Sequence, residues 1–231
     1  MAPKGRYGIK RFLRVAAGVL LLILLLPFGL TLLYGIVAPV STLMLWRFAT
    51  FQRVERVWVP LARISPALVV TVIVAEDARY CRHHGLDVES LVEVMEEADD
   101  LRGARGASSI TQQTAKNLFL WQSRSFVRKA LELPLALWLD FVLGKRRVLE
   151  IYLNIAEWGP NGEFGIEAGA RRAFGKPAHD LDAREAALLA AMLPNPHRRD
   201  ARRPGPGLRR LAGIYQARAA AAPVVAACVR R

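Results

Sequence analysis

Two adjacent acids, Glu76 and Asp77, follow directly on the apolar run at residues 72–75. An ionised carboxylate is costly to remove from water unless it is paired or its pKa changes. Partial burial behind this run is expected to raise the pKa of Glu76 toward the ambient pH, where a general base works best. The position is therefore typical of a carboxylate that accepts a proton during a reaction.

A polar stretch, GASSITQQTAKN, occupies residues 106–117. Positions 109, 112, 113 and 116 fall on one face of a helix, which predicts a polar stripe that carries a positive charge. Such a stripe suits sugar hydroxyls and phosphate, although polar helix faces more often meet only solvent. The candidate binding residues in this stretch are Ser108, Thr111, Gln112, Gln113, Lys116 and Asn117.

Basic residues dominate the segment 102–129, which contains no acid. Arg128 and Glu132 share one helix face, and the simplest interpretation is a surface ion pair worth less than about 1 kcal/mol. The polar stripe beside them favours a second interpretation, a cluster of cations that stabilises negative charge as it develops. The cations of interest are Lys116, Arg124, Arg128 and Lys129.

Five stretches, in order along the chain, resemble the motifs of the peptidoglycan glycosyltransferases of family fifty-one. The departures are mild: Tyr80 stands where the family has Phe, Ala107 and Ser109 differ in the second motif, and Ala173 replaces an aromatic residue. The resemblance covers roughly residues 60–196 and fades over the basic stretch that follows. The five stretches are EDARYCRHHG, GASSITQQTAKN, RKALE, KRRVLEIYLN and GIEAGARRAFGK.

The resemblance implies an all-α, lysozyme-like glycosyltransferase domain with a membrane-associated lobe. It also implies a reaction, the polymerisation of lipid II into linear glycan strands for the bacterial cell wall. In that reaction the 4-hydroxyl of the acceptor sugar attacks the anomeric carbon of the donor. Undecaprenyl pyrophosphate leaves, and the configuration at the anomeric carbon inverts.

The family pattern also implies roles for individual residues. Glu76 is expected to be the general base, with Asp77 supporting its orientation, and the four cations to stabilise the pyrophosphate. Glu132 would either position those cations or assist the leaving group. His83, the motif histidine, is expected to form hydrogen bonds near the cleft. The expected catalytic residues are Glu76 and Glu132, and the expected substrate-binding residues are Asp77, His83, Ser108, Thr111, Gln112, Gln113, Lys116, Asn117, Arg124, Arg128 and Lys129.

Groups of His, Asp and Glu with convincing metal-ligand spacing are absent from the sequence, so no metal site and no required cofactor are predicted. A divalent cation can still bind together with the pyrophosphate. Glu150 and Asn154, in the fourth motif, are expected to brace the scaffold rather than to touch the reacting atoms.

The elements that must position these residues are expected to be helices. Ser65 and Pro66 form a typical helix start, and this helix should run to about Tyr80 with Glu76 near its end. A long helix is expected through residues 126–144, with a kink or a break at Pro134. Sustained alternation with hairpin turns, which would indicate a β-sheet, is not seen in any segment.

An uncharged segment, residues 15–46, precedes the motifs. It exceeds the roughly 20 residues that span a bilayer, so one N-terminal transmembrane helix is expected at residues 15–40. A cleaved signal peptide is the alternative, but the apolar core of such a peptide is usually only about 7–15 residues long. The basic N-terminal tail should stay cytoplasmic, which places the catalytic domain on the periplasmic side of the inner membrane.

The net charge of +13 is concentrated at the two ends of the chain. Residues 1–14 carry +5 and residues 197–231 carry +8, so the part between them is balanced. Basic arms suit an anionic membrane surface as well as nucleic acid, and no nucleic-acid-binding motif is present. The expected partners are therefore lipid II, the growing strand and membrane lipids, with other wall-synthesis or division proteins as further candidates.

The chain is expected to divide into five parts. Aromatic and basic residues alternate after the transmembrane segment, which suits the lipid headgroup layer or an ordinary connector. The C-terminal part is rich in Pro, Gly and Arg and is expected to be loosely held, while Cys81 and Cys228 can pair or remain free thiols. The parts are a basic cytoplasmic tail at 1–14, a transmembrane helix at 15–40, a membrane-interface connector at 41–64, the glycosyltransferase domain at 65–196 and a basic C-terminal extension at 197–231.

Two other functions fit parts of this pattern. A lysozyme-like hydrolase or a lytic transglycosylase would also use two carboxylates in a helical fold. The cations between Glu76 and Glu132 argue against that function, because a neutral glycosidic leaving group needs no such charge. A non-catalytic scaffold that holds wall synthases at the membrane is the other alternative, and it would not depend on Glu76.

Overall fold

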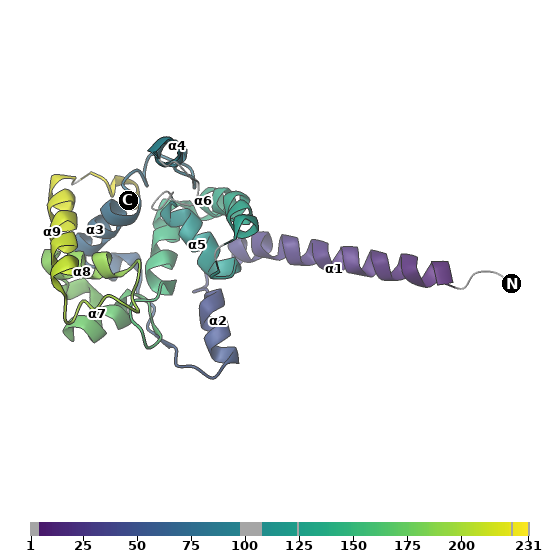
Figure 1. Ribbon diagram of the computed structural model, residues 1–231, viewed down its shortest axis with the longest axis horizontal. Coiled ribbons are helices and arrows are strands. Elements are labelled where there is room, and N and C mark those ends of the chain that lie inside the picture. Colours follow the sequence, from purple (N-terminus) through teal and green to yellow (C-terminus); the bar gives the residue numbers. More distant parts are fainter. Residues whose placement is uncertain (1–4, 98–107, 124, 223, 231) are drawn as a thin grey trace.

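The structure is a computed structural model that describes residues 5–97, 108–123, 125–222 and 224–230. Helices provide nearly all of the regular structure in these residues, as the sequence predicts (Figure 1). The α-helices are α1 (Gly5–Leu33), α2 (Thr42–Ala49), α3 (Pro66–Glu76), α4 (Val88–Glu97), α5 (Ile110–Phe119), α6 (Phe126–Ile155), α7 (Ile166–Phe174), α8 (Ala183–Met192) and α9 (Pro206–Ala221). The short 3₁₀ helices are η1 (Leu61–Arg63), η2 (Ala178–Asp180) and η3 (Ala227–Val229), and the strands are β1 (Glu55–Arg56) and β2 (Glu163–Phe164).

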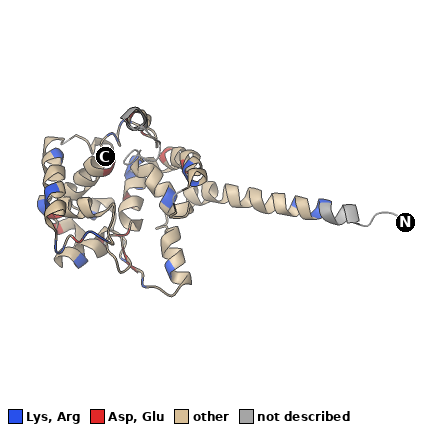
Figure 2. Ribbon diagram, in the orientation of Figure 1, with Lys and Arg blue, Asp and Glu red and all other residues tan. Residues whose placement is uncertain are grey.

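Helix α1 projects away from the rest of the molecule (Figure 1). Its segment Lys10–Leu33 is long and apolar enough to cross a membrane, and its apolar side chains are exposed. Charged residues on it lie only toward its N-terminal end (Figure 2). The helix ends at Leu33, before the end expected at residue 40, and the chain turns there.

The C-terminal end of α1 is held against α6. The indole nitrogen of Trp138 donates a hydrogen bond to the carbonyl of Phe28 at 3.1 Å. Arg147 donates to the carbonyl of Tyr34 at 2.9 Å, just beyond the helix end. These bonds use carbonyls that the helix itself leaves free or shares, so α1 is joined to the body of the protein at one defined place.

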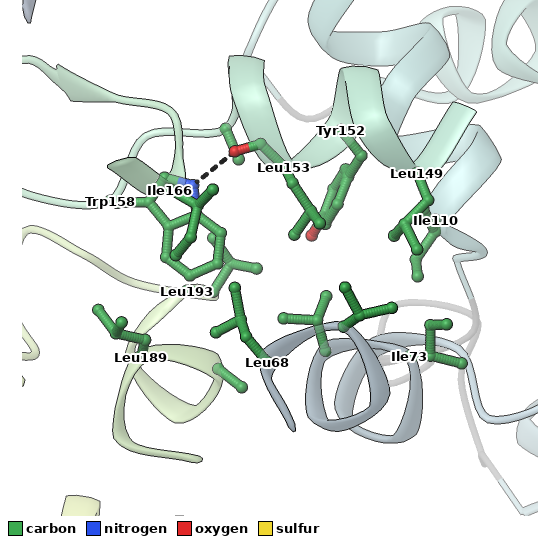
Figure 3. Close-up of a cluster of buried hydrophobic side chains, with 14 of the residues drawn as sticks. Leu68, Ile73, Ile110, Leu149, Tyr152, Leu153, Trp158, Ile166, Leu189 and Leu193 are labelled. Carbon is green, nitrogen blue, oxygen red and sulfur yellow. Dashed lines mark hydrogen bonds between the residues drawn. The ribbon is translucent and has the colours of Figure 1, made fainter. Parts of the chain in front are cut away.

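Helix α3 runs through the centre of the body. Its residues from Leu68 to Val74 are all buried, because the helix is apolar on every side and other elements surround it. Figure 3 shows Leu68 and Ile73 of α3 facing Leu149 and Leu153 of α6. Helices α8 and α9 pack against α3 as well. The apolar run before Glu76 is thus the central helix of the core.

Helix α6 bends at Gly144 and not at Pro134, where the sequence predicted a kink or a break. Gly144 has φ of 67° and ψ of 165°, a conformation that only glycine adopts readily. Pro134 stays inside the helix. A proline has no N–H to donate, so the carbonyl of Ala130, four residues earlier, loses its helical partner. The helix tolerates this loss because Ala130 is exposed. The bend separates the part of α6 that carries Glu132 from the part that carries Tyr152.

The segment between α1 and α3 is joined to the body by a small parallel pairing. Strand β1 pairs with β2, with Glu55 opposite Glu163 and Arg56 opposite Phe164. Glu150 accepts a hydrogen bond from the amide of Leu61 at 2.7 Å, so it braces the scaffold as the sequence predicts. Two-residue strands leave no alternating pattern for a sequence to show.

Asn154 also braces this segment, as expected. Its side chain accepts from the amide of Val59 at 2.9 Å and donates to the carbonyl of the same residue at 2.8 Å. The two hydrogen bonds resemble those between neighbouring strands, with the side-chain amide of Asn154 in place of a backbone peptide group. These two residues of the fourth motif therefore serve the connector rather than the reacting atoms.

The C-terminal segment is packed and not loosely held, contrary to expectation. Helix α9 lies along α8 and α3 and buries Leu208 and Ala212 (Figure 1). A disulfide then joins Cys228 to Cys81, 147 residues earlier in the chain. Composition alone misled the prediction, because a few well-placed apolar residues and one covalent link are enough to order an Arg-rich segment.

Candidate active site

Glu76 is the last residue of α3 and lies largely buried at the edge of a pocket. The pocket has a volume of about 340 Å³, and Arg79, Glu93 and Ser108 are among its other lining residues. Burial raises the pKa of the Glu76 carboxyl above its usual value. A hydrogen bond from Gln113 and the positive charges of Lys116 and Arg199 oppose that rise. The carboxylate thus combines access to the pocket with a raised pKa, which suits a general base.

Gln113 orients Glu76. Its amide nitrogen donates to Glu76 Oε2 at 3.0 Å, and its amide oxygen accepts from the hydroxyl of Tyr152 at 3.1 Å. Tyr152 is fully buried, and burial raises its pKa well above the usual value, so the hydroxyl stays neutral and donates. The tyrosine therefore fixes which end of the amide faces the carboxylate.

Asp77 does not contact the Glu76 carboxylate directly, because its own carboxylate points toward α5 and His83. Its side chain is 0% exposed, accepts from the amide of Ile110 at 2.9 Å, and meets His83 Nε2 at 2.9 and 3.0 Å. Asp77 therefore joins the end of α3 to the start of α5. It acts on Glu76 by placing the helix that carries Gln113 and not by direct contact.

His83 belongs to a buried polar network behind the pocket. Its Nδ1 lies 3.4 Å from the ammonium of Lys145, which forms an ion pair with Asp140 at 2.8 Å. The same ammonium lies 4.6 Å from the ring centre of Tyr80. With its other nitrogen on Asp77, the histidine is a hydrogen-bonding residue near the cleft, which was the role expected.

The cluster of cations lies on the first turns of α6 and is organised by Glu132. Glu132 is buried, and its two oxygens contact Arg128 Nη1 and Lys129 Nζ, the latter at 3.0 Å. Lys129 Nζ also donates to Ser108 Oγ at 2.6 Å. Both carboxylate oxygens are engaged by cations, so the geometry favours a positioning role for Glu132 over assistance to the leaving group.

Lys116 lies between the base and this cluster. Burial lowers the pKa of its ammonium, and the charges of Arg128 and Lys129 lower it further, while Glu132 and Glu76 raise it. Lys116 therefore interacts electrostatically both with Glu76 and with the pair Arg128 and Lys129.

Comparisons with known proteins agree with this arrangement. A family model described as Transglycosylase matches residues 45–217. The chain is 60% identical over 213 residues to the biosynthetic peptidoglycan transglycosylase of Rhodopseudomonas palustris strain TIE-1, covering 92% of this chain and 90% of the relative. The protein of the same name from Nitrobacter winogradskyi is 59% identical over 214 residues, which cover 93% of this chain and 95% of the relative. The one from Agrobacterium fabrum is 52% identical over 212 residues, which cover 91% of this chain and 93% of the relative.

The chain belongs to the transglycosylase family. It is therefore a glycosyltransferase, and the lysozyme-like helical fold expected for it is confirmed. The matched region is wider than the domain expected at 65–196 and includes most of α2 and most of α9. This agrees with the packing, since α9 covers the central helix.

The transglycosylase uses part of its polar stripe to cap α5, although Ser109 also lines the pocket. Ser109 and Gln112 form a capping box at the start of the helix, and Thr111 is fully buried in the core. The side chains of Gln112 and Thr111 are therefore closed to substrate, contrary to their expected binding role. The carbonyl of Asn117 accepts from Thr42 at 3.2 Å, while Arg124 lies outside the described residues.

One group of potential metal ligands is present near the pocket. Ligand atoms of Asp77, His83 and Asp87 lie within 4.8 Å of one another. Asp87 accepts from the amide and the hydroxyl of Ser90 at 2.9 and 2.7 Å, and the other two residues bind each other. Hydrogen bonds of the protein thus already occupy these atoms, and their geometry favours a structural role.

Three residues of this site were not singled out from the sequence. Tyr152 fits the apolar pattern of its helix, and Lys145 is one of several charges at the start of the fourth motif. Arg199, in the C-terminal extension, donates to the carbonyl of Ala191 at 2.6 Å and acts on the charge of Glu76. All three become visible only when the helices are packed, because each lies far along the chain from Glu76.

Proposed function

We propose that this transglycosylase polymerises lipid II into linear glycan strands, with Glu76 as the general base. Family membership supports the reaction class, glycosyl transfer in peptidoglycan synthesis. The observation that carries the mechanism is a pocket-lining carboxyl of raised pKa that interacts with Lys116, which in turn interacts with Arg128 and Lys129. The base and the anion site needed for transfer from a lipid-linked diphosphate sugar are thus adjacent.

The base step needs a carboxylate that can take a proton near neutral pH. Glu76 accepts the proton of the acceptor 4-hydroxyl as the oxygen attacks the anomeric carbon of the donor. Burial raises the pKa of Glu76, which increases its affinity for that proton. Gln113 holds the carboxylate in place during the transfer, and attack from the side opposite the leaving group gives inversion.

The leaving group is a pyrophosphate, which carries concentrated negative charge. Lys116, Arg128 and Lys129 stabilise that charge as the glycosidic carbon separates from the phosphate oxygen. Glu132 keeps two of these cations in place. A divalent cation can accompany the pyrophosphate but is not required by this arrangement, because side-chain cations already supply positive charge.

The membrane is the surface on which this reaction takes place. Helix α1 spans the bilayer, the basic N-terminus stays in the cytoplasm and the catalytic domain lies on the periplasmic side. Exposed aromatic residues in the connector support contact with the lipid headgroups, since Trp46 is 63% and Phe51 98% exposed. The lipid tail of the substrate then stays in the bilayer while its sugar enters the pocket.

Two incubations of the purified full-length protein test the proposal. With lipid II alone we expect long glycan strands and released undecaprenyl pyrophosphate, and with finished cell wall we expect no soluble fragments. Fragments from the wall and no polymer from lipid II would identify a hydrolase or lytic enzyme instead. A scaffold would give no product in either incubation.

A further inference from the structure

A second cavity, of about 590 Å³, adjoins the pocket of Glu76. Val74, Ala78 and Arg79 line both, so the two cavities are neighbours. The second cavity, here called the C-terminal groove, lies between the end of α3 and the last residues of α9. Its other lining residues are Cys81, Arg82, Arg218, Ala221, Ala222, Val224 and Val225.

The C-terminal groove is apolar inside and positively charged at its rim. Arg79 is bound by Glu93 at 2.5 Å and lies near Asp87, so its charge is already matched. Arg82 and Arg218 are exposed, and within the described part of the chain neither forms an ion pair or a side-chain hydrogen bond. Two guanidinium groups thus line an apolar groove, and no acid of the described residues pairs with either of them.

The walls of the groove are held together covalently. Cys81 lines it and forms the disulfide with Cys228, which joins the loop after Glu76 to the C-terminal segment. A ligand that enters therefore meets a preformed surface, which limits the conformational entropy lost on binding.

We propose that the C-terminal groove binds the acidic peptide carried by the peptidoglycan chain as it is extended. The inference rests on the proposed function, because that function supplies a sugar chain in the adjoining pocket. The peptides of such chains carry free carboxylates, which match the two unpaired arginines, and alanine methyl groups, which match the apolar floor.

The position of the groove favours a peptide over a lipid. Helix α9 lies at the end of the body away from α1 (Figure 1). In a protein anchored by α1, a groove beside α9 therefore lies at the end of the body away from the membrane anchor. A strand that grows away from the membrane passes on this side, and its peptides come within reach of Arg82 and Arg218.

The test compares two substrates: lipid II with its complete peptide, and the same lipid-linked disaccharide without the peptide. The Arg82→Ala/Arg218→Ala double variant should raise the KM for the complete substrate about tenfold, from the loss of two exposed charge contacts. Its kinetics on the peptide-free substrate should match those of the wild type. Arg210→Ala is the matched control, an exposed arginine of α9 that does not line the groove.

Each outcome decides between the hypotheses. No polymer from either substrate with the wild type would overturn the proposed function itself. Polymer formation with an unchanged ratio of the two KM values in the double variant would overturn only the peptide site. Equal losses on both substrates would also contradict it, as would equal binding of the free peptide to wild type and double variant in a calorimetric titration.

Discussion

Replacing Glu76 by Gln tests the proposed base most directly. The substitution removes the proton acceptor but keeps the size of the side chain and an oxygen that can accept from Gln113. The surrounding helices therefore have no reason to move, and any effect on rate can be assigned to the lost carboxylate.

The expected loss of rate follows from the contribution of general base catalysis. Such catalysis typically supplies a factor of about 10²–10⁴, so we expect kcat for Glu76→Gln to fall by about that factor. This corresponds to about 3–5 kcal/mol of transition-state stabilisation, at about 1.4 kcal/mol for each factor of ten. We expect the upper part of the range, because burial moves the pKa of Glu76 toward the pH at which a base is most effective.

Stability should change in the opposite direction from activity. The pKa of Glu76 is higher in the folded protein than in the unfolded chain, so the folded state binds the proton more tightly. Stability is therefore lost as the pH rises through the interval between the two pKa values. At neutral pH the neutral amide lacks the desolvation cost of the carboxylate, and Glu76→Gln should be at least as stable as the wild type.

Two measurements in detergent check this reasoning: continuous assay of lipid II consumption from pH 4 to 9, and thermal unfolding at the same pH values. The wild-type rate should fall on the acid side with an apparent pKa above the usual range of a glutamate. Glu89→Gln is the control, since that side chain is 81% exposed and its variant should keep the wild-type rate. Full activity of Glu76→Gln, or a loss of activity matched by a loss of stability, would refute the assignment.

Three further changes test the surroundings of the base. Lys116→Met should lower kcat/KM for lipid II at least about tenfold, since the pyrophosphate loses a buried cation; unchanged steady-state kinetics would remove Lys116 from the anion site. Lys145→Met should lower the free energy of unfolding, measured by urea titration, by about 3 kcal/mol, because the carboxylate of Asp140 stays buried without its cation. Lys176→Met is the control, since Lys176 forms a mostly exposed ion pair with Glu185. A smaller loss of stability in Lys145→Met than in this control would contradict the prediction. Cys81→Ser should lower Tm, because removing a disulfide that closes so long a loop costs up to about 5 kcal/mol of unfolding free energy. Reductant should lower the Tm of the wild type by a similar amount and leave the Tm of the variant unchanged.

Candidate residues for the reaction could be proposed from the sequence because their chemical character is local, and their catalytic roles stay predictions. An acid behind an apolar run and a run of cations without acids are visible in the order of residues alone. The segment at α1 was predicted for the same reason, since length and composition suffice for a membrane span. The all-α class followed from helical spacing, which each segment shows independently of the others.

The partners of these groups were decided only by packing. Gln113 rather than Asp77 binds the carboxylate of Glu76, because the junction of α3 and α5 turns Asp77 toward Ile110. The bend of α6 at Gly144 likewise depends on backbone conformation, which residue type restricts but does not choose.

The C-terminal extension shows most clearly what could not be predicted from the sequence. Its composition indicated a loose arm, yet α9 covers α3, Arg199 acts on Glu76, and Cys228 is joined to the loop beside the pocket. Residue order determined which chemical groups the protein possesses and which segments are helical, because those properties depend on neighbours in the chain. Which groups meet depends on contacts between residues far apart in the chain, from 37 positions for Glu76 and Gln113 to 147 for the disulfide, and only the tertiary structure decided those.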